Sequence, residues 1–188
     1  MSDPFGCVGS SIKLRSGKYL DLGDPQPDQF DFADIAGALS KICRFGGQIE
    51  SFYSVAEHAY HCSRVAGFDN RSLEEQTAVL MHDATEAFLG DCVKPLKNLL
   101  PEYVVIEWRM EQVIAEKFGI DFDKHTEVVK EIDRAMLIAE RRNFFGSDGK
   151  TWAGEDEVRR LSIEFHCWDY QDAETMFVLR ARELGIKF

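Results

Sequence analysis

The sequence lacks a long hydrophobic run. No apolar stretch approaches the ~20 residues that a helix needs to cross a bilayer, and the N-terminus has no signal-peptide core. We therefore expect a cytoplasmic protein without a membrane partner.

Basic residues are also few. The chain has 22 Lys and Arg against 33 Asp and Glu, which gives a formal net charge of −11. An acidic surface repels the phosphates of nucleic acids and of anionic lipids, so no nucleic acid is expected as a partner. An anionic small substrate would need a local cation or a metal ion.

Paired cysteines with metal-binding spacing are absent as well. The cysteine count is odd and no C-x-x-C motif occurs, which is typical of reduced core residues rather than of a disulfide framework or a zinc cluster. The five cysteines are Cys7, Cys43, Cys62, Cys92 and Cys167. Internal repeats and domain linkers are lacking too, so 188 residues with 45% hydrophobic content predict one domain.

The stretch 78–91 combines apolar and ionisable residues. Its apolar side chains cover nearly the whole circumference of a helix, whereas His82, Asp83 and Glu86 fall within an arc of about 100°. Since a buried unpaired carboxylate is costly, these groups need partners, and a divalent metal ion is one solution. The alternative is a core histidine flanked by two surface carboxylates.

Hydrophobic periodicity and turn residues predict a largely helical chain. Capping boxes at 54–57 and 72–75 indicate two helix starts, and glycines indicate several helix ends. The predicted elements are a β-hairpin within 11–22, a loop at 23–28, helices from 34 to the glycine pair at 46–47, from 54, from 72 to 90, over 101–118, over 127–145 and over 171–184, and a mobile loop at 146–154.

Two histidines follow the helix start at Ser54. His58 projects within the apolar stripe of this helix, whereas His61 lies at its margin. His58 is therefore expected to be buried, either as a satisfied core residue or, if other ligands converge on it, as a metal ligand. His61 is expected to be structural or to pair with a nearby acid.

The helix at 127–145 turns Asp133 and Glu140 toward its apolar stripe. An inward acid is either a ligand or the partner of an inward-facing arginine. Arg44, at the end of the first predicted helix, either complements the helix dipole or contributes to a site.

Several polar residues follow the helix that carries Glu86. Asp91, Lys94 and Lys97 come just beyond its predicted end, and the lysines are either solvated or functional. Trp152, in the predicted loop, either covers a pocket or packs.

His58, His82, Asp83 and Asp133 are all expected on buried helix faces. Two imidazoles and two carboxylates suit a borderline divalent ion better than a thiolate-loving one, and they leave positions open for water and substrate. We expect one divalent ion, which can be Mn, Co, Ni, Fe, Zn or Mg. The order of the four residues resembles the H…HD…D signature of the HD-domain metal-dependent phosphohydrolases.

This resemblance covers most of residues 35–140. The segment 82–91, followed by Lys94, Pro95 and Lys97, is similar to the active-site region of bacterial deoxyribonucleoside 5′-monophosphatases and of related phage deoxyadenosine triphosphohydrolases. The four ligands and the E-x-x-x-x-D extension make the similarity specific.

Arg44 and Phe45, ahead of the segment 54–58, resemble the upstream arginine region of the same group. The resemblance implies that both residues contact substrate. The monophosphatases carry a tryptophan where this chain has Phe45, so nucleotide selectivity is not carried over.

The resemblance implies an all-α HD-domain helical bundle with a small N-terminal β-hairpin. We expect a single domain over 1–188, with the hairpin and a loop at 1–30, the metal-site helical core at 31–145, and the loop and C-terminal helix at 146–188. Related enzymes form dimers or larger assemblies, so a homo-oligomer is expected.

The resemblance also implies hydrolysis of a phosphate ester, because a bound metal ion activates water and polarises a phosphoryl oxygen. Glu86, one turn beyond His82, would act as general acid or base or orient the nucleophile. Arg44 and Lys94 would neutralise phosphate charge, and Asp91 resembles the family residue near the sugar.

The first expected substrate is a nucleoside 5′-monophosphate. Triphosphohydrolysis of a dNTP is the second, and a signalling nucleotide such as a cyclic dinucleotide or (p)ppGpp is the third. A different class is a binding or sensor module that keeps metal and nucleotide without turnover. Glu86 argues against that class, because a non-catalytic domain has no chemical need for it.

Overall fold

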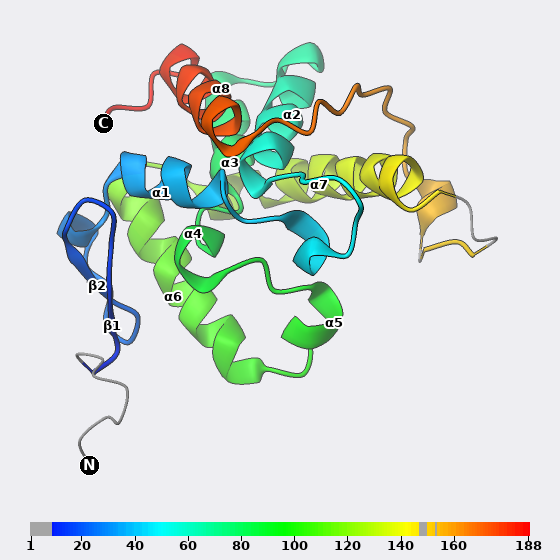
Figure 1. The fold of residues 1–188 in the computed structure, drawn as a ribbon. Coiled ribbons are helices and arrows are strands. Elements are labelled where there is room, and N and C mark those ends of the chain that lie inside the picture. The colour runs from blue at the N-terminus through cyan, green and yellow to red at the C-terminus, as the bar shows by residue number, and fades with distance from the viewer. Residues whose placement is uncertain (1–8, 147–149, 153) are drawn as a thin grey trace.

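The computed structural model describes residues 9–146, 150–152 and 154–188. It is mostly helical with a small antiparallel two-stranded sheet, which confirms the predicted helical class and the N-terminal hairpin (Figure 1). Cys7 and part of the loop predicted to be mobile lie outside the described residues. The elements are β1 (Ser11–Lys13), β2 (Tyr19–Asp21), α1 (Phe32–Leu39), α2 (Val55–Phe68), α3 (Leu73–Met81), α4 (Glu86–Leu89), α5 (Lys94–Lys97), α6 (Pro101–Phe118), α7 (Phe122–Phe144) and α8 (Tyr170–Glu183), with 3₁₀ turns at Pro27–Gln29, Arg44–Gly47 and Glu155–Glu157.

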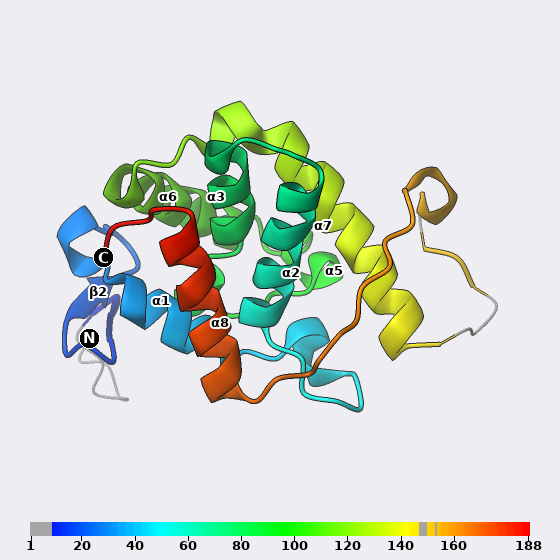
Figure 2. The ribbon, with the colours of Figure 1, turned by 90° about the horizontal axis from the view of Figure 1, so that it is seen from above.

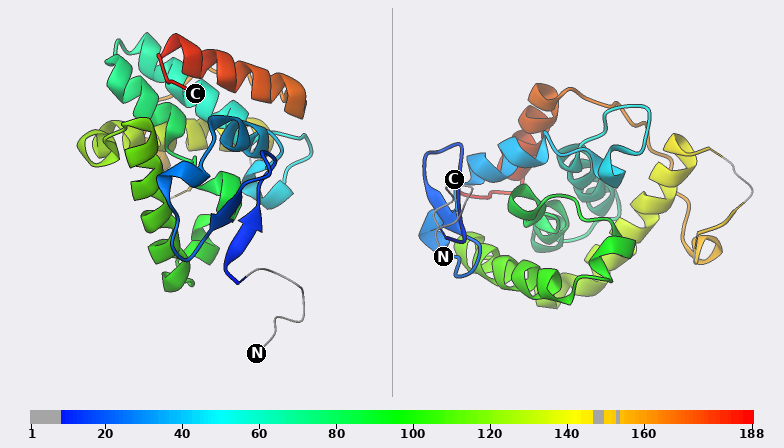
Figure 3. Two further views of the ribbon diagram at one scale, coloured as in Figure 1. Left: turned by 90° about the vertical axis from the view of Figure 1, so that its left-hand side faces the viewer. Right: turned by 60° about the horizontal axis from the view of Figure 1, so that its bottom comes forward.

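Helices α2 and α3 pack against each other at the centre of the molecule. Helix α7 packs on both of them, and α8 packs on α2 and α1 from the other side (Figure 2). Figure 3 shows α6 and α7 following each other around the side away from α8, with the hairpin at one end. This arrangement leaves the C-terminal end of α3 between α2 and α7.

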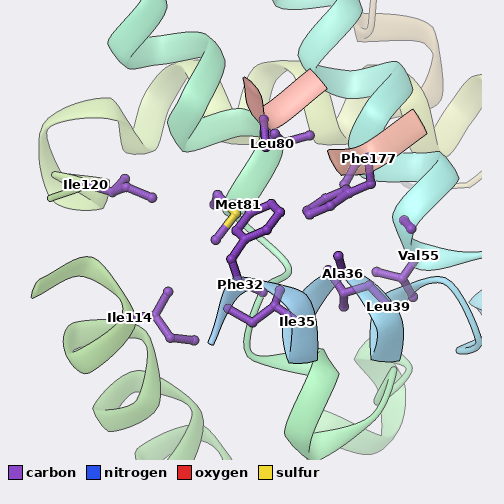
Figure 4. Packing of buried hydrophobic residues seen from close by; sticks show 14 of the residues in the cluster. Phe32, Ile35, Ala36, Leu39, Val55, Leu80, Met81, Ile114, Ile120 and Phe177 are labelled. Carbon is purple, nitrogen blue, oxygen red and sulfur yellow. The ribbon is translucent and has the colours of Figure 1, made fainter. Parts of the chain in front are cut away.

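The main hydrophobic core lies between α1, α3, α6 and α8. Phe32 and Ile35 of α1 lie near Leu80 and Met81 of α3 and near Phe177 of α8 (Figure 4). Each of these side chains is at most 2% exposed. Burying one such side chain contributes about 1.5–3 kcal/mol, so this core fixes the position of α3.

A second cluster of buried residues joins α2, α3 and α7. Its members are Cys62, Val65, Ala66, Val79, Ile132 and Met136. These contacts hold together the three segments that carry His58, His82 and Asp133.

Local capping explains several helix boundaries. Ser72 and Glu75 form a reciprocal capping box, as the sequence predicted. Ser54 is the predicted N-cap and accepts a hydrogen bond from the N–H of Glu57, but the predicted box does not close, because the Glu57 carboxylate accepts from the N–H groups of residues 166–168 instead. Gly119 ends α6 with φ 67°, also as predicted. Helix α7 begins at Phe122, earlier than expected, because Asp121 accepts from the N–H of Lys124 and caps it.

The first predicted helix is shorter than expected. It ends at Leu39 instead of continuing to the glycine pair. Arg44 donates its N–H to Tyr53 O at 2.9 Å, and Val55 donates to Ile42 O at 3.0 Å. This extended pairing uses backbone groups that a continued helix would need, so Arg44 does not lie at the C-terminal end of α1.

The helix predicted over 72–90 is interrupted. Helix α3 ends at Met81, a turn follows, and α4 begins at Glu86. The Nδ1 of His82 donates to Val79 O at 2.8 Å, and this carbonyl is the acceptor that Asp83 would use in a continuous helix. The side chain of His82 thus competes with the helix that the sequence predicted.

Among the described residues, no helix has the length and apolar character needed to cross a membrane. The four cysteines in this part of the chain are the free thiols Cys43, Cys62, Cys92 and Cys167; Cys62 is buried as predicted, whereas the other three are half-buried and are not core residues.

Candidate metal centre

Four side chains from three segments converge at one point between α2, the end of α3 and α7. The Nε2 atoms of His58 and His82 lie 3.4 Å apart. Oδ1 of Asp133 lies 3.3 Å from Nε2 of His58 and 3.7 Å from Nε2 of His82. Oδ2 of Asp83 lies 3.6 Å and 3.3 Å from the same two atoms. The structure therefore brings together all four residues that the sequence singled out as ligands.

Hydrogen bonds to the second ring nitrogen orient both imidazoles. Val79 O can only accept, so the Nδ1 of His82 carries the proton. The Nδ1 of His58 lies 2.5 Å from Oε1 of Glu140, a buried carboxylate that also accepts from Tyr53 OH at 2.9 Å. Both Nε2 atoms therefore face the same point and can offer their lone pairs to a metal ion once they lose their protons, as metal-ligating histidines do.

The spacing of the donors fits a divalent ion. Ligand bonds of about 2.1 Å place neighbouring ligands of a tetrahedral or octahedral ion about 3.0–3.4 Å apart. The ligand atoms of His58, His82 and Asp133 all lie within 4.8 Å of one another and could hold such an ion. Two imidazole nitrogens and two carboxylates that face one another are balanced either by protons on the imidazoles or by a metal ion between the four groups, and their spacing suits the metal ion.

The electrostatics of the cluster favour positive charge. Burial and Arg44 act to lower the pKa of His58, but surrounding negative groups, including Glu140, raise it well above its ordinary value. Burial would raise the pKa of Asp133, yet hydrogen bonds with His58 and His82 hold it well below its ordinary value. The site thus holds its carboxylate ionised and attracts a proton or a metal ion.

Arg44 links the cluster to a second layer of charge. Its Nη1 donates to Oδ2 of Asp83 at 3.4 Å and its Nη2 donates to Oε2 of Glu140 at 3.2 Å. The residue is 8% exposed, and its Nε finds no hydrogen-bond partner among the described residues. Glu140 is therefore the partner of an inward-facing arginine, one of the alternatives that the sequence left open.

A cavity of about 770 Å³ opens beside the cluster. This volume is in the range of small-molecule sites. Asp83, Glu86 and Asp133 line it together with Arg44. The side chain of Asp133 is 42% exposed whereas that of His58 is fully buried, so the cluster is accessible from the carboxylate side.

Glu86 is a buried acid in the cavity wall. It is 7% exposed, and its Oε2 has no hydrogen-bond partner in the described part of the chain. Burial, followed by the charges of Asp83 and Asp91, raises the pKa of Glu86 to about 10. In the metal-free protein this carboxyl group therefore keeps its proton at neutral pH, and its place in the cavity wall puts it within reach of a bound molecule.

The other residues predicted to bind substrate also line this cavity. They are Phe45, Asp91 and Lys94, and Trp152 lines it as well. Lys97 lines the cavity too, but its Nζ pairs with Oε1 of Glu107 at 2.6 Å.

His61 is a buried histidine outside the metal-ligand cluster. Its Nε2 lies 3.4 Å from Oε1 of Glu57. It therefore pairs with a nearby acid, which is one of the two alternatives predicted from the sequence.

Several contributors to the site were not predicted from the sequence, among them Tyr53, Leu137, Ile138 and Phe145. Tyr53, which contacts Glu140, directly precedes the N-cap Ser54 and no pattern distinguishes it. Leu137 and Phe145 form part of the cavity wall, although the sequence pattern predicts that apolar residues on α7 and just after it belong to the hydrophobic core. Only the folded arrangement exposes them to the cavity.

Comparisons with known proteins give relatives without a described activity. No protein-family model matches the sequence. Over 143 residues the chain is 43% identical to the uncharacterized protein YfdR of Escherichia coli, and the match covers 76% of this chain and 77% of YfdR. Over 113 residues it is 34% identical to an uncharacterized protein of Rhodobacter capsulatus, with 57% of this chain and 58% of that protein covered.

Proposed function

The chain belongs to the same family as YfdR of Escherichia coli, and we propose that it is an HD-domain phosphohydrolase that releases phosphate from a nucleoside 5′-monophosphate. The observation that carries this proposal is the convergence of His58, His82, Asp83 and Asp133 on one point beside a cavity. A pure packing role would not require four ligand groups to face one another.

A divalent ion held by His58, His82, Asp83 and Asp133 would supply Lewis acidity for activating water and polarising a phosphoryl oxygen. The ordering of both imidazoles by Val79 O and Glu140 means that little reorganisation accompanies binding. The exposed side chain of Asp133 keeps the cavity side of the centre open to substrate.

Arg44 and Lys94 are the cavity cations that we assign to the phosphate. Arg44 is fixed between Asp83 and Glu140, so its guanidinium is pre-oriented beside the centre. In the reaction, water adds to phosphorus and the bond from phosphorus to the 5′-oxygen breaks. Glu86 lines the same cavity and is the group that we assign to proton transfer to the departing oxygen.

We assign Asp91 to the sugar. It lines the cavity, and a carboxylate there can accept a hydrogen bond from a sugar hydroxyl.

The charge balance of the cavity favours a monophosphate over a triphosphate. Lys97 is paired with Glu107 at 2.6 Å, and Arg134 lies 4.0 Å from Glu157. Of the cations that line the cavity, Lys94 alone has no acidic partner among the residues that the structure describes. A triphosphate carries about twice the charge of a monophosphate and would need more unpaired cations.

The test is a panel of nucleoside mono- and triphosphates with detection of phosphate, pyrophosphate and triphosphate. The protein is treated with EDTA, and Mn²⁺, Co²⁺, Ni²⁺, Zn²⁺ or Mg²⁺ is added back. Metal-dependent phosphate release from monophosphates is expected. Release of triphosphate from dNTPs would favour the triphosphohydrolase instead.

A binding or sensor module is the alternative from a different class. In that case nucleotide and metal bind, but no product appears with any metal. The Glu86→Gln variant separates the two functions. If the protein is an enzyme, the variant should bind nucleotide but lose the hydrolysis that the wild type shows. If the protein is a binding module, neither protein should hydrolyse nucleotide.

A further inference from the structure

The end of the cavity formed by Phe45, Phe145 and Trp152 is aromatic. The rings of Phe45 and Phe145 lie 5.1 Å apart at 86°, and that of Trp152 lies 6.5 Å and 5.9 Å from them. Leu137 and Ile138 complete an apolar wall on this side. The cavity therefore has a charged end beside the metal-ligand cluster and an apolar end made of rings.

These rings are not simply core. Phe145 is 41% exposed and Trp152 is 36% exposed, whereas Phe30 and Phe177 in the main core are fully buried. Large apolar side chains that remain exposed inside a cavity are typical of ligand sites.

The backbone at Phe45 is strained. Its φ of 59° and ψ of 27° lie in the left-handed region, which costs a non-glycine residue about 1–2 kcal/mol. Strain of this kind occurs preferentially at functional sites, where the surrounding structure holds it. Here it follows Arg44 directly, and the Arg44 guanidinium lies 5.4 Å from the centroid of the Phe45 ring. The turn thus places a phosphate-binding cation and an aromatic ring side by side.

We infer that Phe45, Phe145 and Trp152 form an aromatic subsite that binds the base of a nucleotide. This inference rests on the proposed function and adds the recognition element for the part of the substrate away from the phosphate. Flat aromatic rings bind bases by stacking, and stacking tolerates every base because each has a π-face. Since the side chains of this wall offer only the indole N–H as a polar group, the subsite should favour the larger purines by ring area and not by hydrogen bonds.

The discriminating pair of ligands is AMP and ribose 5-phosphate, which carries a hydroxyl at the carbon where AMP carries the base. Affinities are measured by calorimetry in EDTA, so that no turnover occurs. Loss of a stacking side chain should weaken binding of a base about 5- to 150-fold. The wild-type protein should therefore bind AMP more tightly than ribose 5-phosphate, and Trp152→Ala should remove most of that difference.

Three further variants sharpen the test. Phe145→Ala should act like Trp152→Ala, and Trp152→Phe, which keeps a ring, should retain most of the AMP affinity. Phe68→Ala is the matched control, because Phe68 is an aromatic residue that is 74% exposed and lies outside the cavity. It should leave both affinities unchanged.

Equal wild-type affinities for AMP and ribose 5-phosphate would overturn the aromatic subsite, and so would a Trp152→Ala variant that weakens both ligands alike. Either result leaves metal-dependent phosphate release untouched. Conversely, a protein that prefers AMP through Trp152 but hydrolyses nothing would retain the subsite and refute the phosphohydrolase. The binding measurement can therefore refute the aromatic subsite, and the turnover measurement can refute the phosphohydrolase, independently of each other.

Discussion

Oε1 of Glu140 lies 2.5 Å from Nδ1 of His58, and the same carboxylate accepts from Arg44 through its other oxygen at 3.2 Å. Glu140 is fully buried. One side chain of α7 therefore orients both a candidate metal ligand and the cation that we assign to the substrate phosphate. Outer partners of this kind raise the basicity of the ligand and fix its ring.

Glu140→Gln should weaken metal binding. An amide cannot match the charge that the carboxylate offers to the Nδ1–H of His58, and loss of such partners typically costs about 10–100-fold in metal affinity. The measurement is a competition titration with a chromophoric chelator. Glu127→Gln is the control, because Glu127 lies on the same helix with a side chain that is 94% exposed. An unchanged affinity in a folded Glu140→Gln protein would contradict the assigned role.

Metal binding should stabilise the fold. A ligand that binds only the folded state at 100 times its Kd adds about 2.7 kcal/mol to the free energy of unfolding. For a chain of this size, that corresponds to a rise in Tm of roughly 5–10 °C. Thermal unfolding with and without Mn²⁺ measures the rise, which His58→Ala should abolish. A His58→Ala variant with the full wild-type rise would place the ion elsewhere.

Glu86→Gln should stabilise the metal-free protein, and increasingly so as the pH rises. The pKa of Glu86 is about 10 in the folded protein against 4.5 for the free side chain. Above pH 4.5 Glu86 therefore ionises more easily in the unfolded chain than in the folded protein. The free energy of unfolding of the wild type falls by up to about 1.4 kcal/mol per pH unit until the pH reaches the pKa of the folded protein. Urea unfolding of both proteins at pH 5 and pH 8 in EDTA tests this. A stability difference that does not grow with pH would refute the burial of this acid.

Glu57→Ala should destabilise the protein. Its buried carboxylate accepts the N–H groups of His166, Cys167 and Trp168 at 2.8, 3.0 and 2.8 Å. Figure 2 shows the segment that contains them, in orange, running past α2 to the start of α8. The three N–H groups belong to half-buried or exposed residues, where water replaces part of the lost hydrogen bonding, so a loss of about 1–3 kcal/mol in urea unfolding is expected.

Glu57→Gln provides the comparison for that loss. It keeps an acceptor oxygen and should cost less than Glu57→Ala. A loss below about 1 kcal/mol for Glu57→Ala would mean that other groups satisfy these donors.

The local features of this fold were predictable from the sequence. The capping box of Ser72 and Glu75 and the glycine at 119 each depend on a few neighbouring residues, and the structure has both. The approach of His58 to Asp133 was predictable because each residue lies on the apolar face of its helix, and apolar faces pack toward the common core.

Features that depend on one particular hydrogen bond were not predictable. Arg44 belongs to an extended pairing with Tyr53, nine residues further along the chain, and no pattern at Arg44 reveals this partner. The interruption after Met81 depends on a side-chain bond of His82, which a pattern of hydrophobicity does not contain. The link from Glu140 to His58 joins residues 82 positions apart, and the sequence could only offer an arginine partner or a ligand role as alternatives.

The most direct test of the metal-dependent phosphohydrolase measures metal content and phosphate release from a nucleoside 5′-monophosphate in the same samples. The proteins are the wild type, Asp133→Asn and the control Asp123→Asn, which changes an exposed acid in the first turn of α7. About one ion per chain and metal-dependent release are expected for the wild type and for Asp123→Asn, and neither for Asp133→Asn. A wild-type protein that binds no ion, or an Asp133→Asn protein that releases phosphate at the wild-type rate, would contradict it.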